Sequence, residues 1–173
     1  GSDTAQLVSE NEYLEGKLIE LKTRLQIQNN LVLENQKLTQ LLDATYTIPK
    51  YQITLAHVKS ISQSRLKKQV IINKGSKDSV RNTQLAVGSD GVIGQVTQVT
   101  PLYSTVLLIT DPTQHMPVKN VRNGIRGITK GLATNERGMI VEFIPLDSDV
   151  KLGDIFVTSG IGTTYPPGYL VGK

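Results

Sequence analysis

Three polar residues occur in the chain order of a chymotrypsin-like catalytic triad: His57, Asp111 and Ser159. In such a triad the histidine takes the proton of the serine hydroxyl, and the aspartate orients the histidine. Ser159 is followed by a single glycine and lacks the Gly-Asp-Ser-Gly-Gly context of that class. We keep a chymotrypsin-like serine hydrolase as an alternative function, and we expect His57 to be a half-buried structural residue on an alternating strand.

A glycine-rich segment at residues 158–168, TSGIGTTYPPG, has some features of a phosphate-binding loop. The dinucleotide-binding pattern requires a third glycine at position 165, where this chain has Tyr165, and a following helix, which Pro166-Pro167 prevents. Gly162 permits an unusual backbone angle, and Pro167-Gly168 suits the corner of a type II turn. The segment is therefore predicted to be a tight connection between strands that shapes a surface.

Metal-ligand and acid-pair patterns are weak in this chain. It has no cysteine and two histidines, and His115 has no second histidine or carboxylate at ligand spacing. Asp147, Asp149 and Asp154 are close in sequence, but the oxygen-rich loop that calcium requires does not surround them. We expect these carboxylates to be solvated loop residues, and we expect neither a metal nor a cofactor.

The elements that must position these residues begin with a long helix. Residues 3–44 contain one glycine, no proline and many strong helix formers, which predicts a helix of the coiled-coil type. Six residues follow the alternating four- and three-residue spacing of a heptad seam: Leu7, Asn11, Leu14, Leu18, Leu21 and Leu25. Beyond Leu25 the apolar pattern shifts, so we expect the seam to slip there. We predict that this seam pairs with a second copy, in a homodimer or a higher assembly.

The orientation of that helix pair stays open. In a parallel homodimer the flanking contacts set Glu10 against Glu15 and Lys17 against Lys22, which are like-charge pairs. An antiparallel pair instead lets Glu15 face Lys22. Exposed charge pairs contribute only tenths of a kcal/mol, so apolar packing can override them. An alternative is that the helix folds back onto its own domain.

Residues 45–173 have the pattern of many short strands separated by turns. Ile48-Pro49 closes the helical section, and the Asp90-Gly91 pair is typical of a hairpin. Segment 105–110 is apolar on both faces, which predicts a central strand. The pattern favours an all-β barrel or sandwich, or two small barrels. The expected strands are 51–55, 70–72, 85–87, 92–96, 105–110, 116–118, 125–128, 139–143, 155–158 and 169–171.

Charge is distributed unevenly along the chain. Residues 7–44 carry six acidic and four basic side chains, whereas residues 45–173 carry eight acidic and fifteen basic ones. A basic body makes an anionic-polymer-binding module a further alternative. No aromatic stacking platform is interleaved with the basic residues, which argues against nucleic acid. The basic residues in question are Arg65, Lys67, Lys68, Lys74, Lys77, Arg81, Lys119, Arg122, Arg126 and Lys130.

Five motifs that follow the predicted coiled-coil helix in sequence resemble those of the rod shape-determining MreC family. No single motif is specific, but their number and order are. Ser79 stands where that family more often has glycine. The motifs are INKGSKD at 72–78, DGVIGQV at 90–96, VLLITDP at 106–112, GDIFVTSG at 153–160 and PPG at 166–168.

The resemblance implies a mainly β fold with an N-terminal α-helical coiled coil at residues 3–44 and two small β-barrel subdomains within residues 45–173. It implies a non-enzymatic scaffold of the bacterial cell-wall elongation complex, anchored in the cell membrane by a single span outside this sequence, with this part extracytoplasmic. The implied partners are MreD, a class B penicillin-binding protein and a cell-wall glycosyltransferase. We expect partners to dock by strand addition or on the loop tyrosines Tyr103, Tyr165 and Tyr169.

Overall fold

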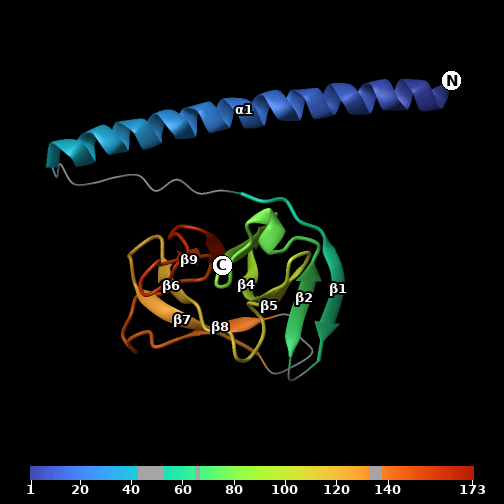
Figure 1. The fold of residues 1–173 in the computed structure, drawn as a ribbon. Helices are drawn as coiled ribbons and strands as arrows, with labels where there is room; N and C mark the ends of the chain where they lie inside the picture. The colour runs from blue at the N-terminus through green and yellow to red at the C-terminus, as the bar shows by residue number, and fades with distance from the viewer. Residues whose placement is uncertain (43–52, 65–66, 133–137) are drawn as a thin grey trace. The chain divides into compact units, whose positions relative to one another are not determined.

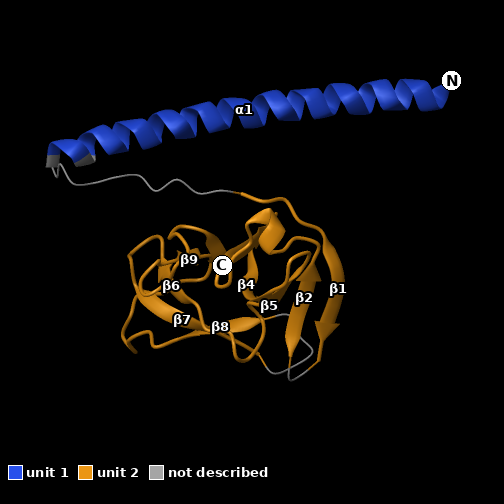
Figure 2. Cartoon of the chain, in the orientation of Figure 1, with its two compact units in different colours: residues 1–52 blue, residues 53–173 orange. Residues whose placement is uncertain are grey.

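The computed structural model describes residues 1–42, 53–64, 67–132 and 138–173. The chain divides into two compact units, Gly1–Gln52 and Ile53–Lys173, which are coloured separately in Figure 2. The expected boundary between residues 44 and 45 lies outside the described residues, as does the Ile48-Pro49 step.

The first unit contains one helix, α1, which runs over Ser2–Leu42. The predicted long helix is thus confirmed, and at about 1.5 Å per residue it extends for roughly 60 Å. Glu20 forms ion pairs with Lys17 at 3.3 Å and with Arg24 at 2.7 Å, three and four residues away on the same helix face. Among the described residues, no helix is both long and apolar enough to cross a membrane.

The second unit begins with a five-stranded antiparallel sheet in the order β1-β2-β5-β4-β3. The predicted central strand is β5, which lies between β2 and β4 (Figure 1). A short 3-10 helix, Ser76–Asp78, follows β2. The strands of this sheet are β1 Val58–Gln63, β2 Lys68–Ile72, β3 Leu85–Gly88, β4 Gly91–Val99 and β5 Ser104–Leu108.

A second five-stranded antiparallel sheet follows, in the order β10-β9-β6-β7-β8. Its strands are β6 Pro117–Asn120, β7 Arg126–Gly131, β8 Met139–Glu142, β9 Phe156–Thr158 and β10 Leu170–Gly172. The mainly β fold behind an N-terminal helix is therefore as predicted. The expected strand at 51–55 is wrong where it is described, because residues 53–57 form no strand and the first one begins at Val58.

The hairpin at Asp90-Gly91 is also confirmed, and it has a second role. Gly91 has a φ of +122°, and a Cβ at this position would lie 2.5 Å from the carbonyl oxygen of Leu170. Only glycine allows the β3–β4 hairpin to approach β10 so closely. Val92 then packs with Phe156, Val171 and their neighbours in one apolar cluster that contains side chains of both sheets. The two sheets thus share this cluster, and a second cluster belongs to the first sheet and the loop beside it.

The connection between β5 and β6 is held by a buried carboxylate. Asp111 is 1% exposed, and it accepts hydrogen bonds from the Lys68 N–H at 2.7 Å, the Thr113 N–H at 2.8 Å and the Thr113 hydroxyl at 2.6 Å. The buried Lys68 side chain donates from Nζ to the carbonyl of Leu132, just beyond β7. Lys68 therefore links β2 of the first sheet to the end of β7 in the second.

Hydrogen bonding outweighs burial at this carboxylate. Burial alone would raise the pKa of Asp111, but the bonds from the Thr113 hydroxyl, the Lys68 N–H and the Thr113 N–H hold its pKa below the ordinary value. A depressed pKa means that the ionised form stabilises the fold above the pKa of an unfolded aspartate, about 3.9, and that this contribution disappears on acidification.

We predict that Asp111→Asn lowers the free energy of unfolding by about 1–3 kcal/mol at neutral pH, because an amide replaces a charged acceptor of buried donors. The loss should become smaller as the pH falls below about 4, because the unfolded chain then binds a proton at Asp111, and it should be smallest below the depressed pKa of folded Asp111. Urea unfolding at both pH values measures it, with the exposed Asp90→Asn as the control. An equal loss at both pH values would contradict this assignment.

Candidate interaction surfaces

The structure does not assemble the triad that the chain order suggests. His57 is exposed rather than half-buried, and its backbone N–H donates to Asn73 at the end of β2. Asp111 contacts Lys68, at the other end of β2. Five residues of strand separate these two points by roughly 16 Å. Ser159 directly follows β9 of the second sheet. The geometry therefore does not support the serine hydrolase alternative.

The other candidate catalytic and metal-ligand residues also form structural contacts. His115 places Nδ1 3.2 Å from the carbonyl oxygen of Thr129, and the described residues contain no group of three potential metal ligands. We expected Asp149 and Asp154 to be solvated loop residues, but both form ion pairs with Arg122. That expectation is corrected below, where these carboxylates organise a loop.

The segment 158–168 connects two strands, as predicted. The hydroxyl of the fully buried Thr158 donates to the carbonyl of Pro166 at 2.9 Å and accepts from the Tyr169 N–H at 3.0 Å. The Gly168 N–H donates to the Thr158 carbonyl, and the φ of +93° at Gly168 is the value that the second corner of a type II turn requires. Thr158 therefore connects the two ends of this loop through hydrogen bonds. The loop is a strand connection and does not have the structure of a phosphate-binding loop.

The three tyrosines proposed as a partner surface have different environments. Tyr103 is 45% exposed, so it remains available. Tyr165 is only 7% exposed and belongs to the core cluster, and its burial raises the pKa of its hydroxyl. Tyr169 is half-buried against the same cluster. The expectation that Tyr165 is an exposed contact residue is therefore wrong, because its ring fills the core beneath the loop.

The seam of α1 is uncovered within the described structure. The five leucines at positions 7, 14, 18, 21 and 25 are 52 to 60% exposed, and Asn11 among them is exposed as well. Apolar side chains repeated along one helix face are stabilised when a second helix covers them. Pairing of this seam remains a prediction.

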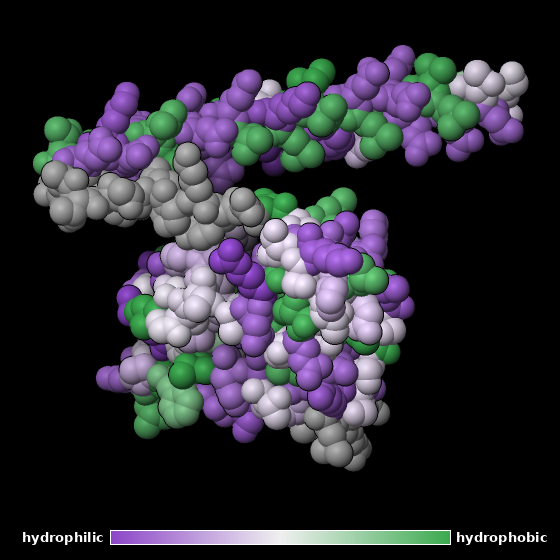
Figure 3. Space-filling model, in the orientation of Figure 1, coloured by the Kyte–Doolittle hydropathy of each residue, from purple (hydrophilic) through white to green (hydrophobic). Residues whose placement is uncertain are grey.

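A second apolar surface lies on residues 143–155, between β8 and β9, which we name the clamped loop. Leu146 and Leu152 are 108% and 106% exposed, and Phe143 is 77% exposed with a left-handed φ of +63°. Apolar side chains gather at the lower left of the body in Figure 3, where the chain beyond β8 runs in Figure 1. The rarely adopted backbone angle of Phe143 and the full exposure of Leu146 and Leu152 make this loop a candidate interaction surface.

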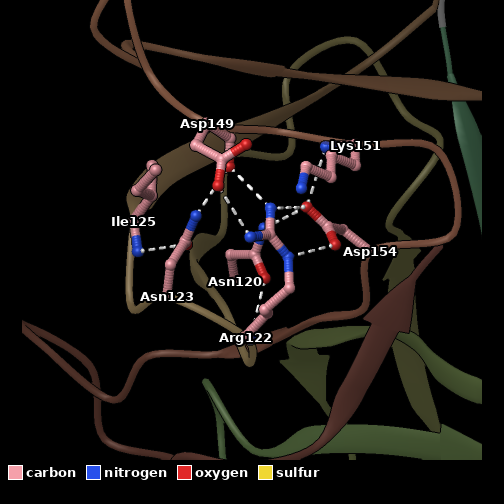
Figure 4. A network of polar contacts seen from close by, with 7 residues as sticks. All are labelled: Asn120, Arg122, Asn123, Ile125, Asp149, Lys151 and Asp154. Carbon is pink, nitrogen blue, oxygen red and sulfur yellow. Dashed lines mark hydrogen bonds and ion pairs between the residues drawn. The ribbon is translucent and has the colours of Figure 1, made fainter.

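The guanidinium of Arg122 holds this loop in place. Arg122, in the turn between β6 and β7, donates from Nε to Asp154 Oδ1 and from Nη1 to Asp149 Oδ2, both at 2.8 Å. Figure 4 shows how its remaining donors reach Asp154 Oδ2 and the Asp149 carbonyl, while the buried Asn120 also donates to Asp154. One planar cation thus joins two points of the loop to the second sheet.

The charge of each partner is secured by the other. Hydrogen bonds to Asp154 and then Asp149 hold the pKa of Arg122 above its ordinary value. Hydrogen bonds from Arg122, then from the Lys151 N–H and the Asn120 amide, hold the pKa of Asp154 well below its ordinary value. Arg122 and Asp154 therefore both remain charged at and above the pKa of an ordinary aspartate, about 3.9.

Sequence reasoning missed the clamped loop because it searched for exposed tyrosines. The available signal was FIPLDSDVKLGD at 143–154, in which apolar residues recur in a segment that contains proline, glycine and three aspartates. Such a segment has turn composition, so its apolar residues have no strand or helix of their own to place them in a core. The contact with Arg122, more than twenty residues earlier, has no sequence signal.

We predict that Arg122→Gln loosens the clamped loop while the sheets stay folded, because a neutral amide cannot bridge both carboxylates. Hydrogen exchange of backbone amides should become faster in residues 143–155 and stay unchanged in β2 and β5. Arg81→Gln, which removes an exposed arginine elsewhere, is the matched control. Unchanged exchange in the loop of Arg122→Gln would show that other contacts hold it.

Comparison with known proteins places this chain in a family. The family model for "Rod shape-determining protein MreC, barrel core" matches residues 58–173. The cell shape-determining protein MreC of Haemophilus influenzae is 34% identical over 169 residues, which is 98% of this chain and 48% of that protein. The Escherichia coli protein of the same name is 33% identical and is matched over 96% of this chain and 45% of its own length.

Solved structures agree with the sequence relatives. MreC of Listeria monocytogenes superposes with a TM-score of 0.75 at 31% identity, over 94% of this chain and 79% of that one. MreC of Pseudomonas aeruginosa gives a TM-score of 0.65 at 33% identity, over 70% of this chain and 77% of that one. The chain spans about half the length of the first two relatives. It belongs to the MreC family of rod shape-determining proteins.

Proposed function

We propose that this protein is a non-enzymatic scaffold of the bacterial cell-wall elongation complex, which controls cell shape by self-associating and by organising peptidoglycan synthases. The relatives are named for cell-shape determination, which supports the cellular role. The observation that carries the mechanism is the uncovered leucine seam of α1. Such a seam is costly in water unless another helix covers it.

The scaffold acts through valency. When two copies pair through α1, each pair carries two bodies, and the second contact with a bivalent partner becomes intramolecular. Weak individual contacts then suffice for a stable assembly, because tethering raises the effective concentration of the second site. This division of labour gives self-association to the helix and recognition to the body.

Membership of the family supports a set of partners and a location for the whole protein. We propose MreD, a class B penicillin-binding protein and a cell-wall glycosyltransferase as partners. We also propose a single-span membrane anchor outside this sequence, with the described part extracytoplasmic. Self-association into a dimer or a larger assembly belongs to the same proposal, and one matched solved structure is described as that of a cell shape-determining filament.

Within the body, the clamped loop is our proposed docking surface for the synthase. Its two protruding leucines and Phe143 offer exposed apolar area that a partner protein can bury. Arg122 fixes them before binding, which reduces the entropy lost on association. Tyr103 stays a candidate contact, whereas Tyr165 and Tyr169 support the core.

We predict that Leu18→Asp abolishes rod shape when it is introduced into the full-length protein of the bacterium that makes it, because a charge in the seam prevents helix pairing. Ile19→Asp is the matched control, since Ile19 is 66% exposed and lies next to the seam rather than in it. Cell outlines measured by microscopy report the result. Normal rods with Leu18→Asp, at normal protein levels, would contradict the proposed role of the seam.

We predict that the double change Leu146→Ser and Leu152→Ser weakens binding to the purified class B penicillin-binding protein by about tenfold or more, because the apolar area of two leucines is no longer buried on binding. Leu102→Ser is the control, since Leu102 is 62% exposed in another loop. Both variants should keep the thermal midpoint of the parent chain. Equal affinity of the double variant and the parent chain would remove the clamped loop from the binding surface.

A further inference from the structure

The outer face of the second sheet brings two cations together. Lys119 of β6 and Arg126 of β7 are direct partners in the antiparallel ladder, so their side chains lie next to each other on one face. Their neighbours Val118 and Gly127 are buried and also pair, which places Lys119 and Arg126 on the opposite, outward face. Arg126 is exposed and Lys119 is half-buried.

This pair of like charges is unfavourable for the sheet itself. Directly opposed like charges destabilise an antiparallel pair. Neither Lys119 nor Arg126 takes part in an ion pair within the described ranges. The carboxylate of Glu142, which lies opposite Ile128 on this face, is 3.8 Å from Lys130. The fold therefore leaves the positive charge of Lys119 and Arg126 uncompensated.

Apolar side chains surround the two cations. Pro117 and Ile128 form the adjacent pair of the same ladder, and both are half-buried. On the other side Lys119 pairs with Val157 of β9, which is itself buried, and Val157 pairs with the half-buried Leu170 of β10. The apolar side chains within reach of a ligand are therefore Pro117, Ile128 and Leu170. A phosphate chain carries no apolar groups that could pack against these side chains. A polypeptide that carries carboxylates and apolar side chains can contact both kinds of group.

We propose that this outer face binds an acidic segment of a partner polypeptide, with Lys119 and Arg126 as the residues that receive its carboxylates. Arg126 offers a planar fork of donors that matches a carboxylate, and Lys119 adds a second charge within reach of the next acidic residue. Binding removes the repulsion between the two cations as well as adding attraction. The proposal concerns a site other than the seam and the clamped loop, and it does not depend on the scaffold function.

The test uses the complete chain and a fluorescent poly-L-glutamate peptide, with binding followed by anisotropy at low and at moderate salt. The variant Lys119→Gln with Arg126→Gln should bind about tenfold more weakly, because two charge-assisted contacts are lost. The control is Lys77→Gln with Arg81→Gln, which removes the same two charges from an exposed lysine in the 3-10 helix and an exposed arginine shortly after it. It should change the affinity by less than about twofold.

Folding is verified independently of binding. Because the Lys119–Arg126 pair is repulsive, the double variant should have a thermal midpoint equal to or above that of the parent chain. Polyphosphate of matched charge, used as a competitor, should displace the peptide less effectively than unlabelled polyglutamate does.

Three results would overturn the proposal. One is the absence of peptide binding by the parent chain at low salt. Another is an equal loss of affinity in the two double variants, which would show attraction to net charge alone. The third is preferential binding of polyphosphate through Lys119 and Arg126, which would identify a phosphate ligand instead.

Discussion

The buried contacts of Lys68 and Asp111 are the interaction on which the body depends. Asp111 lies where the chain leaves the first sheet, and Lys68 extends from β2 to the carbonyl of Leu132 near the end of β7. The carboxylate of Asp111 and the ammonium of Lys68 each bind backbone groups that the crossing would otherwise leave without partners. With the crossing fixed, the hairpin glycine Gly91 can meet β10 and close the shared core.

The packing of the folded body decides which of its apolar side chains are buried and which are exposed to a partner. The aromatic residue that composition suggested for binding, Tyr165, is needed inside because the shared core requires a large side chain beneath the loop. The residues that remain outside, Leu146 and Leu152, are held there by Arg122 rather than by weak packing. The charged hydrogen bonds of Arg122 fix the loop that carries these exposed leucines, which supports the proposal that the clamped loop is a docking surface.

Local patterns predicted most of the elements, and long-range contacts explain what they could not predict. The helix, the hairpin at Gly91, the central strand and the turn at Gly168 follow from spacing and backbone preferences, and the structure contains all four. Burial of Tyr165 and the bonds from Arg122 to Asp149 and Asp154 depend on residues that are distant in sequence. A single sequence carries no signal for such pairs, so the clamped loop was found only in the structure.

We propose that two copies of the protein associate through the leucine seams of their α1 helices. The most direct test is the mass in solution, measured by sedimentation equilibrium over a range of concentrations for residues 3–173 and for residues 53–173. We expect a dimer or a larger species for the longer chain and a monomer for the shorter one. A monomer for the longer chain at every concentration would contradict the claim, because the seam would then have no partner helix.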